Sequence, residues 1–135
     1  MSIKLEDYKE FLEDKPSVRE ALEGTFHEAA RIMSPAGLTD YMDGAKALCN
    51  LGRGHDVVIS YLQEMPLVVK ECGEDIIPDV LTAAMKLSSM TSGEVISLLF
   101  SSLPSAARNL GDAELLRGYL GIHCSAWPAT HAQSH

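Results

Sequence analysis

The stretch Gly54–Leu81, "GHDVVISYLQEMPLVVKECGEDIIPDVL", decides the fold, because a later stretch repeats its pattern. The later stretch, Ser92–Leu120, reads "SGEVISLLFSSLPSAARNLGDAELLRGYL". Pro66 in the first aligns with Pro104 in the second, 38 positions away. The same offset also aligns an acid, three apolar positions and a glycine, namely Asp56 with Glu94, Val58 with Ile96, Leu62 with Phe100, Ile77 with Leu115, and Gly73 with Gly111. Each unit therefore contains an apolar helix, a proline, a second apolar stretch and a stop glycine.

A weaker third copy lies upstream. There "EAARIM" (Glu28–Met33) echoes "SAARNL" (Ser105–Leu110), 77 positions away and about two periods. A period of 38 with two helical pieces per unit is typical of an α-solenoid of HEAT-like size. The alternative is chance similarity among leucine-rich helices that share stop signals. In both cases the sequence predicts an all-α fold of stacked antiparallel hairpins, as a HEAT-like α-solenoid or an irregular bundle of about six to eight helices.

Apolar spacing and stop signals predict where the individual helices begin and end. The expected helices span 3–15, 17–33, 38–51, 55–72, 76–87, 92–110 and 113–120. Pro66 interrupts or kinks the fourth of these helices, and Pro104 falls inside the sixth. N-caps are expected at Ser17, Asp75, Thr91 and Asp112, with capping boxes that pair Ser17 with Glu20 and Thr91 with Glu94.

The composition bounds the class of protein and of partner. A chain of 135 residues with 46% hydrophobic and 22% charged residues has the make-up of one ordinary globular domain. Its formal net charge of −8 disfavours nucleic-acid binding, which needs Lys and Arg to displace counterions, and binding to anionic membranes. Most of this charge is explained by solubility, and docking to a basic partner is the alternative.

The cysteines and the N-terminal sequence bear on localisation. Cys49, Cys72 and Cys124 are odd in number and form no C-x-x-C pair, so we expect reduced thiols in a cytoplasmic protein. The start, "MSIKLEDYKEFLEDK", has no apolar segment of the signal-peptide type. The longest apolar runs are about five residues, far shorter than a membrane span.

No motif specifies a chemistry. The sequence contains no P-loop, no G-x-S-x-G and no H-E-x-x-H. His27 and Glu28 are neighbours on one helix, where adjacent side chains diverge, so His27 is expected to be a partly exposed helix residue. His55 and Asp56 are expected to flank a helix cap. We therefore predict no catalytic residues, no cofactor-binding residues and no metal ligands, and no residues can be named for partner binding.

Two further groups of polar residues have simple structural explanations. His123, Cys124, His131 and His135 match no zinc spacing and fall in a terminal segment without helical period. The acid pairs Glu13–Asp14 and Glu74–Asp75 lie at expected helix ends, where termini and solvated faces account for them.

Several phrases resemble a known family. "SPAGLTDY", "TSGEVISLL" and "LGDAELLRGYL", within a likeness that covers roughly Leu5 to Ile122, are similar to the N-terminal helical region of the CbbO/NorD family. Members are larger proteins that end in a von Willebrand factor A (VWA) domain and work beside a MoxR-type AAA+ ATPase. The family's metal site needs a D-x-S-x-S motif that this chain lacks, so no metal or target-binding residue carries over.

The resemblance implies a non-catalytic adaptor without a cofactor. Its partners would be a CbbQ/NorQ-like ATPase hexamer and the VWA remainder of a longer chain. The target enzyme would be Rubisco, slightly favoured, or nitric oxide reductase. Residues 1–122 would form the single adaptor domain, and residues 123–135 a disordered tail or a truncation or vector end. A chromosomal gene that ends at His135 would instead indicate a free-standing helical-repeat protein that binds a peptide or protein. A small enzyme with a His/carboxylate site is a third, remote alternative.

The segment Leu103–Leu120 shows how a corner is distinguished from a site. Arg108 and Asp112 flank Gly111 and resemble a functional loop. The repeat instead predicts that Gly111 stops one helix and Asp112 caps the next.

Overall fold

The computed structural model describes residues 8, 12–52, 54–89 and 93–121, and within them it contains helices and no strand. The elements are α2 (Pro16–Ile32), α3 (Pro35–Leu51), α4 (His55–Cys72), the 3-10 helix η1 (Glu74–Ile76), α5 (Ile77–Ser88) and α6 (Gly93–Leu110). A last helix spans 113–121. The predicted all-α fold is confirmed.

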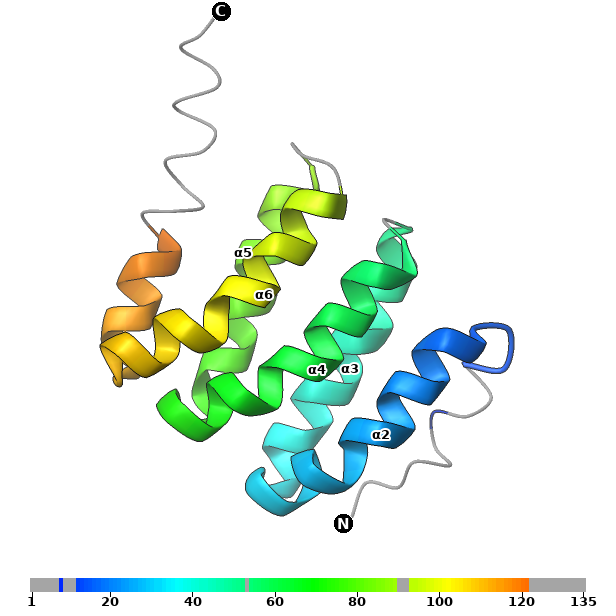
Figure 1. The fold of residues 1–135 in the computed structure, drawn as a ribbon, viewed down its shortest axis with the longest axis horizontal. Coiled ribbons are helices and arrows are strands. Elements are labelled where there is room, and N and C mark those ends of the chain that lie inside the picture. The colour runs from blue at the N-terminus through cyan, green and yellow to red at the C-terminus, as the bar shows by residue number, and fades with distance from the viewer. Residues whose placement is uncertain (1–7, 9–11, 53, 90–92, 122–135) are drawn as a thin grey trace, which may run out of the picture.

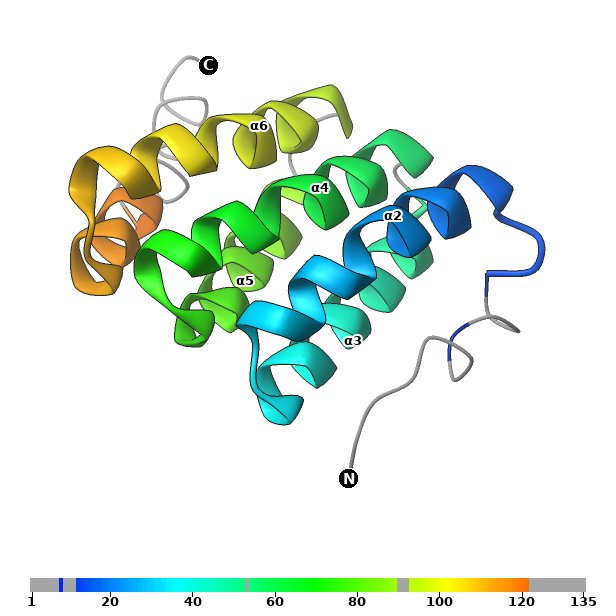
Figure 2. The same ribbon diagram turned by 60° about the horizontal axis from the view of Figure 1, so that its bottom comes forward.

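The helices form two layers of stacked hairpins. Helices α2, α4 and α6 lie side by side and run in the same direction, and α3 and α5 lie behind them (Figures 1 and 2). The chain reverses after each first-layer helix, so α2 with α3, and α4 with α5, are antiparallel hairpins. The helix 113–121 folds back in the same way after α6. This stacking is the architecture expected of a short α-solenoid.

The repeat is clearest in the first layer. Helices α4 and α6 are both 18 residues long, and their ends are offset by the same 38 positions. Three buried positions recur in the same places in α2, α4 and α6: Val18, Val58 and Ile96; Leu22, Leu62 and Phe100; Ala29, Val69 and Ala107. The upstream copy is therefore real, but the alignment at 77 positions is wrong by one residue. It pairs exposed Ala30 with fully buried Ala107, whereas Ala29 is the buried equivalent.

The second layer follows a different register. The expected pairing of Ile77 with Leu115 is wrong, because Ile77 is fully buried and Leu115 is 56% exposed. Leu116 and Leu120 face the core instead. The helix 113–121 is also held to α5 by Arg117, whose Nε donates to the Asp79 carboxylate at 2.8 Å. The second layer thus departs from the 38-residue register, while apolar residues of its last helix still face the core.

The turns confirm some predicted caps and correct others. Gly52, Gly73 and Gly111 end their helices with positive φ, as expected of stop glycines. Asp112 caps the last helix, since its Oδ1 accepts from the amides of Glu114 at 2.7 Å and Leu115 at 3.3 Å.

Two N-caps are wrong. Helix α2 starts at Pro16, so Ser17 lies inside its first turn and makes no cap. Asp75 caps nothing, because the 3-10 helix η1 leads directly into α5. Helix α3 starts at Pro35, three residues earlier than predicted, because Ser34 accepts from the Gly37 amide. Most of the expected helix 3–15, the cap at Thr91, Cys124 and the tail 123–135 lie outside the described residues.

Three aromatic rings tie the two layers together. Tyr41 of α3 stacks on Tyr61 of α4 with ring centroids 5.5 Å apart, and Tyr61 meets Phe100 of α6 edge to face at the same distance. The Tyr61 hydroxyl donates to the Tyr41 carbonyl at 2.8 Å. The Tyr41 hydroxyl donates at 2.6 Å to the carbonyl of Leu62, four residues before Pro66. All three rings are fully buried.

Gly44 lets α3 approach α4 and α5 closely. A Cβ at this position would overlap the Tyr61 hydroxyl and a Leu81 methyl group. A Cβ at Gly24 in α2 would instead have no neighbouring atom within 4 Å, so Gly24 serves as a matched control.

We predict that Gly44→Ala lowers the free energy of unfolding by about 1 to 3 kcal/mol, because Tyr61 is held in place and cannot yield. Gly24→Ala should raise it by about 0.5 to 1 kcal/mol, because alanine favours the helix and meets no neighbour. Urea unfolding followed by circular dichroism measures both. Equal effects of the two substitutions would contradict the close packing at Gly44.

We predict that Asp112→Ala costs about 1 kcal/mol of stability, because two helix amides lose their acceptor. Asp75→Ala should change stability by less than about 0.5 kcal/mol, since Asp75 makes no cap. Urea unfolding of both variants tests whether Asp112, and not Asp75, acts as a helix cap. If partner affinity fell without any loss of stability, the segment around Gly111 would be a functional loop and not a corner.

Candidate protein-binding grooves

A groove runs between α4 and α6 at the end of the molecule where both helices begin. It has a volume of about 770 Å³. We call it the α4/α6 groove, and it is lined by Gly54, Asp56, Val57, Ser60, Gly93, Glu94, Ser97, Leu98 and Ser101. Val57 is buried and forms part of the floor. The groove is a direct result of the stack, because two neighbouring first-layer helices leave a furrow between them.

A second groove, about 370 Å³ in volume, lies between α2 and α4. Its lining uses the helix positions that line the first groove. Ile59 and Gln63 of α4 correspond, 38 positions on, to Ser97 and Ser101 of α6. The first layer therefore presents the same kind of groove at two consecutive junctions.

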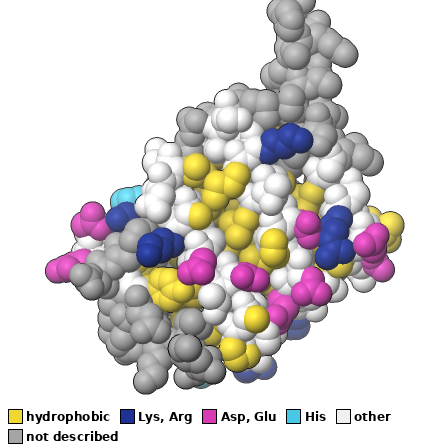
Figure 3. All heavy atoms as spheres, turned by 180° about the vertical axis from the view of Figure 1, so that it is seen from behind, with side chains coloured by type: hydrophobic (Ala, Val, Ile, Leu, Met, Phe, Trp, Pro, Cys, Tyr) yellow, Lys and Arg dark blue, Asp and Glu magenta, His cyan; other side chains and the backbone are white. Residues whose placement is uncertain are grey.

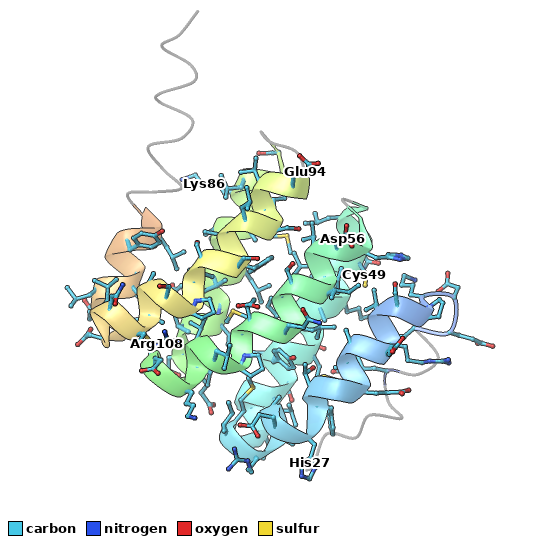
Figure 4. All side chains as sticks on the ribbon, in the orientation of Figure 1. His27, Cys49, Asp56, Lys86, Glu94 and Arg108 are labelled. Atoms are coloured by element: carbon cyan, nitrogen blue, oxygen red, sulfur yellow. The ribbon has the colours of Figure 1, made fainter. Side chains whose placement is uncertain are left out.

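The α4/α6 groove carries negative charge. Asp56 and Glu94, which the repeat aligns, lie in the first turns of α4 and α6 at the same end of the molecule (Figure 4). Both are exposed, and within the described residues neither carboxylate has a hydrogen bond or ion pair. None of the described residues that line it is a Lys or Arg. An acid in the first turn interacts favourably with the dipole of its helix. Here the two acids also give the groove a negative potential that attracts cations.

Leu98 is the residue that the repeat does not explain. Its side chain is 67% exposed and lines the groove. Leu98 belongs to the mostly apolar run Val95–Phe100 of its helix. At the aligned position 38 residues earlier α4 has Ser60, so the fold does not require an apolar residue there. That mismatch was the available signal in the sequence, and it was missed.

The histidines singled out in the sequence do not converge with acids in either groove. His27 is exposed on α2, and Figure 4 places it at the end of the molecule opposite Asp56. His55 begins α4 beside Asp56, as predicted, but lines neither groove. Glu13 and Asp14 are exposed in the turn before α2, where a hydrogen bond from Lys15 lowers the pKa of Asp14.

Glu74 has a structural role that the sequence did not reveal. Its carboxylate accepts from the Ser34 amide at 2.8 Å and from the Ser34 hydroxyl, and Ser34 in turn caps α3 at Gly37. The Ser34 hydroxyl, and then its amide, lower the pKa of Glu74. The contact joins the turn after α2 to the turn after α4, so it links consecutive hairpins.

The two described cysteines are free thiols packed at the edge of the core. Burial raises the pKa of Cys49 and of Cys72, which makes both poor nucleophiles at neutral pH. Among the described residues, no three His, Cys, Asp or Glu side chains come close enough together to hold a metal ion.

The opposite face of the molecule belongs to α3, α5 and the helix 113–121. Figure 3 shows hydrophobic atoms in its centre, surrounded by acidic and basic side chains. Leu81 and Met85 of α5 are only partly buried. In the described part of the chain, no helix has both the length and the apolar character needed to cross a bilayer.

Comparisons with protein-family models, with curated proteins and with solved structures found no match to this chain. The two grooves and the sequence resemblance are therefore the features that bear on function.

We predict that the Glu74–Ser34 contact makes stability depend on pH. Because the folded-state pKa of Glu74 is lowered, its contribution is present above the unfolded value of about 4.3 and is lost as the pH falls through the lower folded value. Glu74→Gln should lower stability at pH 7 and flatten the loss below pH of about 4.3. Urea unfolding of both proteins across this pH range tests it. Parallel pH profiles for the two proteins would contradict the role of Glu74.

Proposed function

We propose that this chain is a non-catalytic protein-binding scaffold, the adaptor domain of a CbbO/NorD-type activator that works with a MoxR-type AAA+ ATPase. The observation that carries the proposal is the groove that recurs at two consecutive junctions of the first layer. Helical repeats of this kind present extended surfaces to other proteins. A site for chemistry would instead bring a base or a nucleophile together with these acids, and no histidine or cysteine is among the described residues that line either groove.

The choice of partner rests on the resemblance. The "SPAGLTDY" phrase forms the turn and first part of α3, where Ser34 and Glu74 join two hairpins, and "LGDAELLRGYL" forms the last corner and helix. Both phrases thus lie at junctions that hold the stack together. The scaffold would hold the ATPase ring near the target enzyme, with Rubisco slightly favoured over nitric oxide reductase.

Retention of the ATPase on the immobilised chain tests this function. We expect a CbbQ-type hexamer to be retained in the presence of ATP, more strongly than a NorQ-type hexamer, and an AAA+ hexamer from outside the MoxR group to pass through. Failure to retain either MoxR-type hexamer would refute the adaptor role. Stronger retention of the NorQ type would reverse the preferred target.

A free-standing repeat protein that binds a peptide or protein is the second candidate. The exposed Leu98 in the α4/α6 groove favours it, because a lone apolar side chain in a furrow suits a peptide. A chain that retains no ATPase but binds a protein segment in this groove would support this candidate.

A further inference from the structure

We propose that the α4/α6 groove binds a segment of a partner protein in which an apolar side chain is flanked by lysine or arginine. The inference deepens the proposed function, since it rests on the chain being a protein-binding scaffold and names the chemistry of the ligand.

The charge of the groove selects for a cation. Asp56 from α4 and Glu94 from α6 stand on its two sides, both exposed and both without a partner in the described part of the chain. Among the described residues of the lining, no Lys or Arg offsets them. Lysine or arginine on the ligand would therefore meet two carboxylates, and the net charge of −8 would steer such a ligand toward the protein.

Leu98 selects for an apolar group between those cations. It follows Glu94 by one helical turn and is exposed over most of its surface. The aligned residue in α4 is Ser60, and that in α2 is Glu20, so neither other unit has an apolar side chain there. An apolar side chain of the ligand would cover Leu98, so that both side chains would be removed from water.

Ser97 adds a polar contact point. Its Oγ is shielded from solvent and has no hydrogen-bond partner within the described part of the chain. Other helix serines, such as Ser88 and Ser102, donate to carbonyls of their own helices. Rotation of the Ser97 side chain toward the groove would let a ligand group complete its hydrogen bonding.

The occupant is a different protein. The chain has 11 Lys and Arg against 19 Asp and Glu, so a second copy would bring mainly repulsion. Nucleic acids and anionic membranes are repelled by the same carboxylates. A short basic and apolar segment of another protein fits both the charge and the exposed leucine.

A synthetic peptide in which leucines alternate with lysine and arginine provides the probe. Two matched peptides replace either its basic residues with glutamate or its leucines with serine. Binding to the full chain is measured by fluorescence anisotropy, and the contact is mapped by chemical-shift changes of backbone amides. We expect only the first peptide to bind well, with the largest shifts at the starts of α4 and α6. Equal binding of all three peptides, or shifts centred on α3 and α5, would overturn the proposal.

Charge reversal tests whether the peptide binds at the α4/α6 groove. The double variant Asp56→Lys/Glu94→Lys should lower the affinity for the first peptide about fivefold to tenfold. Its control, Asp40→Lys/Asp75→Lys, makes the same change in net charge at exposed acids near the other ends of the helices. This control should lower the affinity for the first peptide less than about twofold. Leu98→Ser should weaken it by about tenfold. Circular dichroism confirms that each variant is folded. Equal losses in the two double variants would show unspecific attraction and refute the groove.

The ATPase experiment separates the two proposals. If the groove variant still retains the hexamer as the unmodified chain does, the scaffold function stands and the groove is not its ATPase site. If the peptide binds in the groove while no hexamer is retained, the groove stands and the ATPase role fails.

Discussion

The carbonyl of Leu62 lacks a helical partner because Pro66, four residues later, has no amide hydrogen, and the phenol of Tyr41 supplies the missing donor. A buried carbonyl left without a donor is costly, so α3 must stay where its tyrosine can reach. Tyr61, one residue before Leu62, donates back to the Tyr41 carbonyl and packs on Phe100 of α6. The central helix α4 is thereby fixed against α3 on one side and α6 on the other.

The grooves depend on this arrangement. The α4/α6 groove exists because Phe100 and Tyr61 hold the two helices side by side, with Asp56 and Glu94 in matching places. Burial raises the pKa of both tyrosines well above the usual value, so their hydroxyls stay protonated and remain donors. The Ser34–Glu74 contact adds a second tie between hairpins at the other ends of the helices. A stack held at mid-helix and at one end suits a scaffold that presents its grooves to partners.

The sequence predicts the local features well. The stop glycines Gly73 and Gly111 follow the last residues of α4 and α6, as predicted, whereas Pro66 and Pro104 lie inside these helices and do not interrupt them. One failure comes from a contact between distant residues, and the failed caps come from local features that the residue type alone does not show. Glu74 and Ser34 are 40 positions apart, so nothing local showed that Glu74 binds a turn instead of solvent. Ser17 and Asp75 have the right residue types for caps, but Pro16 and the 3-10 helix η1 determine the helix starts. Leu98 fitted an apolar pattern, and only its mismatch with Ser60 distinguished it.

The hydrogen bond from the Tyr41 hydroxyl to the Leu62 carbonyl is the contact that fixes α3 against α4. The most direct test is a double-mutant cycle on Tyr41 and Pro66. In the unmodified background, Tyr41→Phe should cost about 1 to 3 kcal/mol, because the Leu62 carbonyl loses its donor. In a Pro66→Ala background the new amide at position 66 can donate to that carbonyl, so the same substitution should cost about 0.5 kcal/mol or less. An equal cost in both backgrounds would contradict the claim that the tyrosine compensates for the proline.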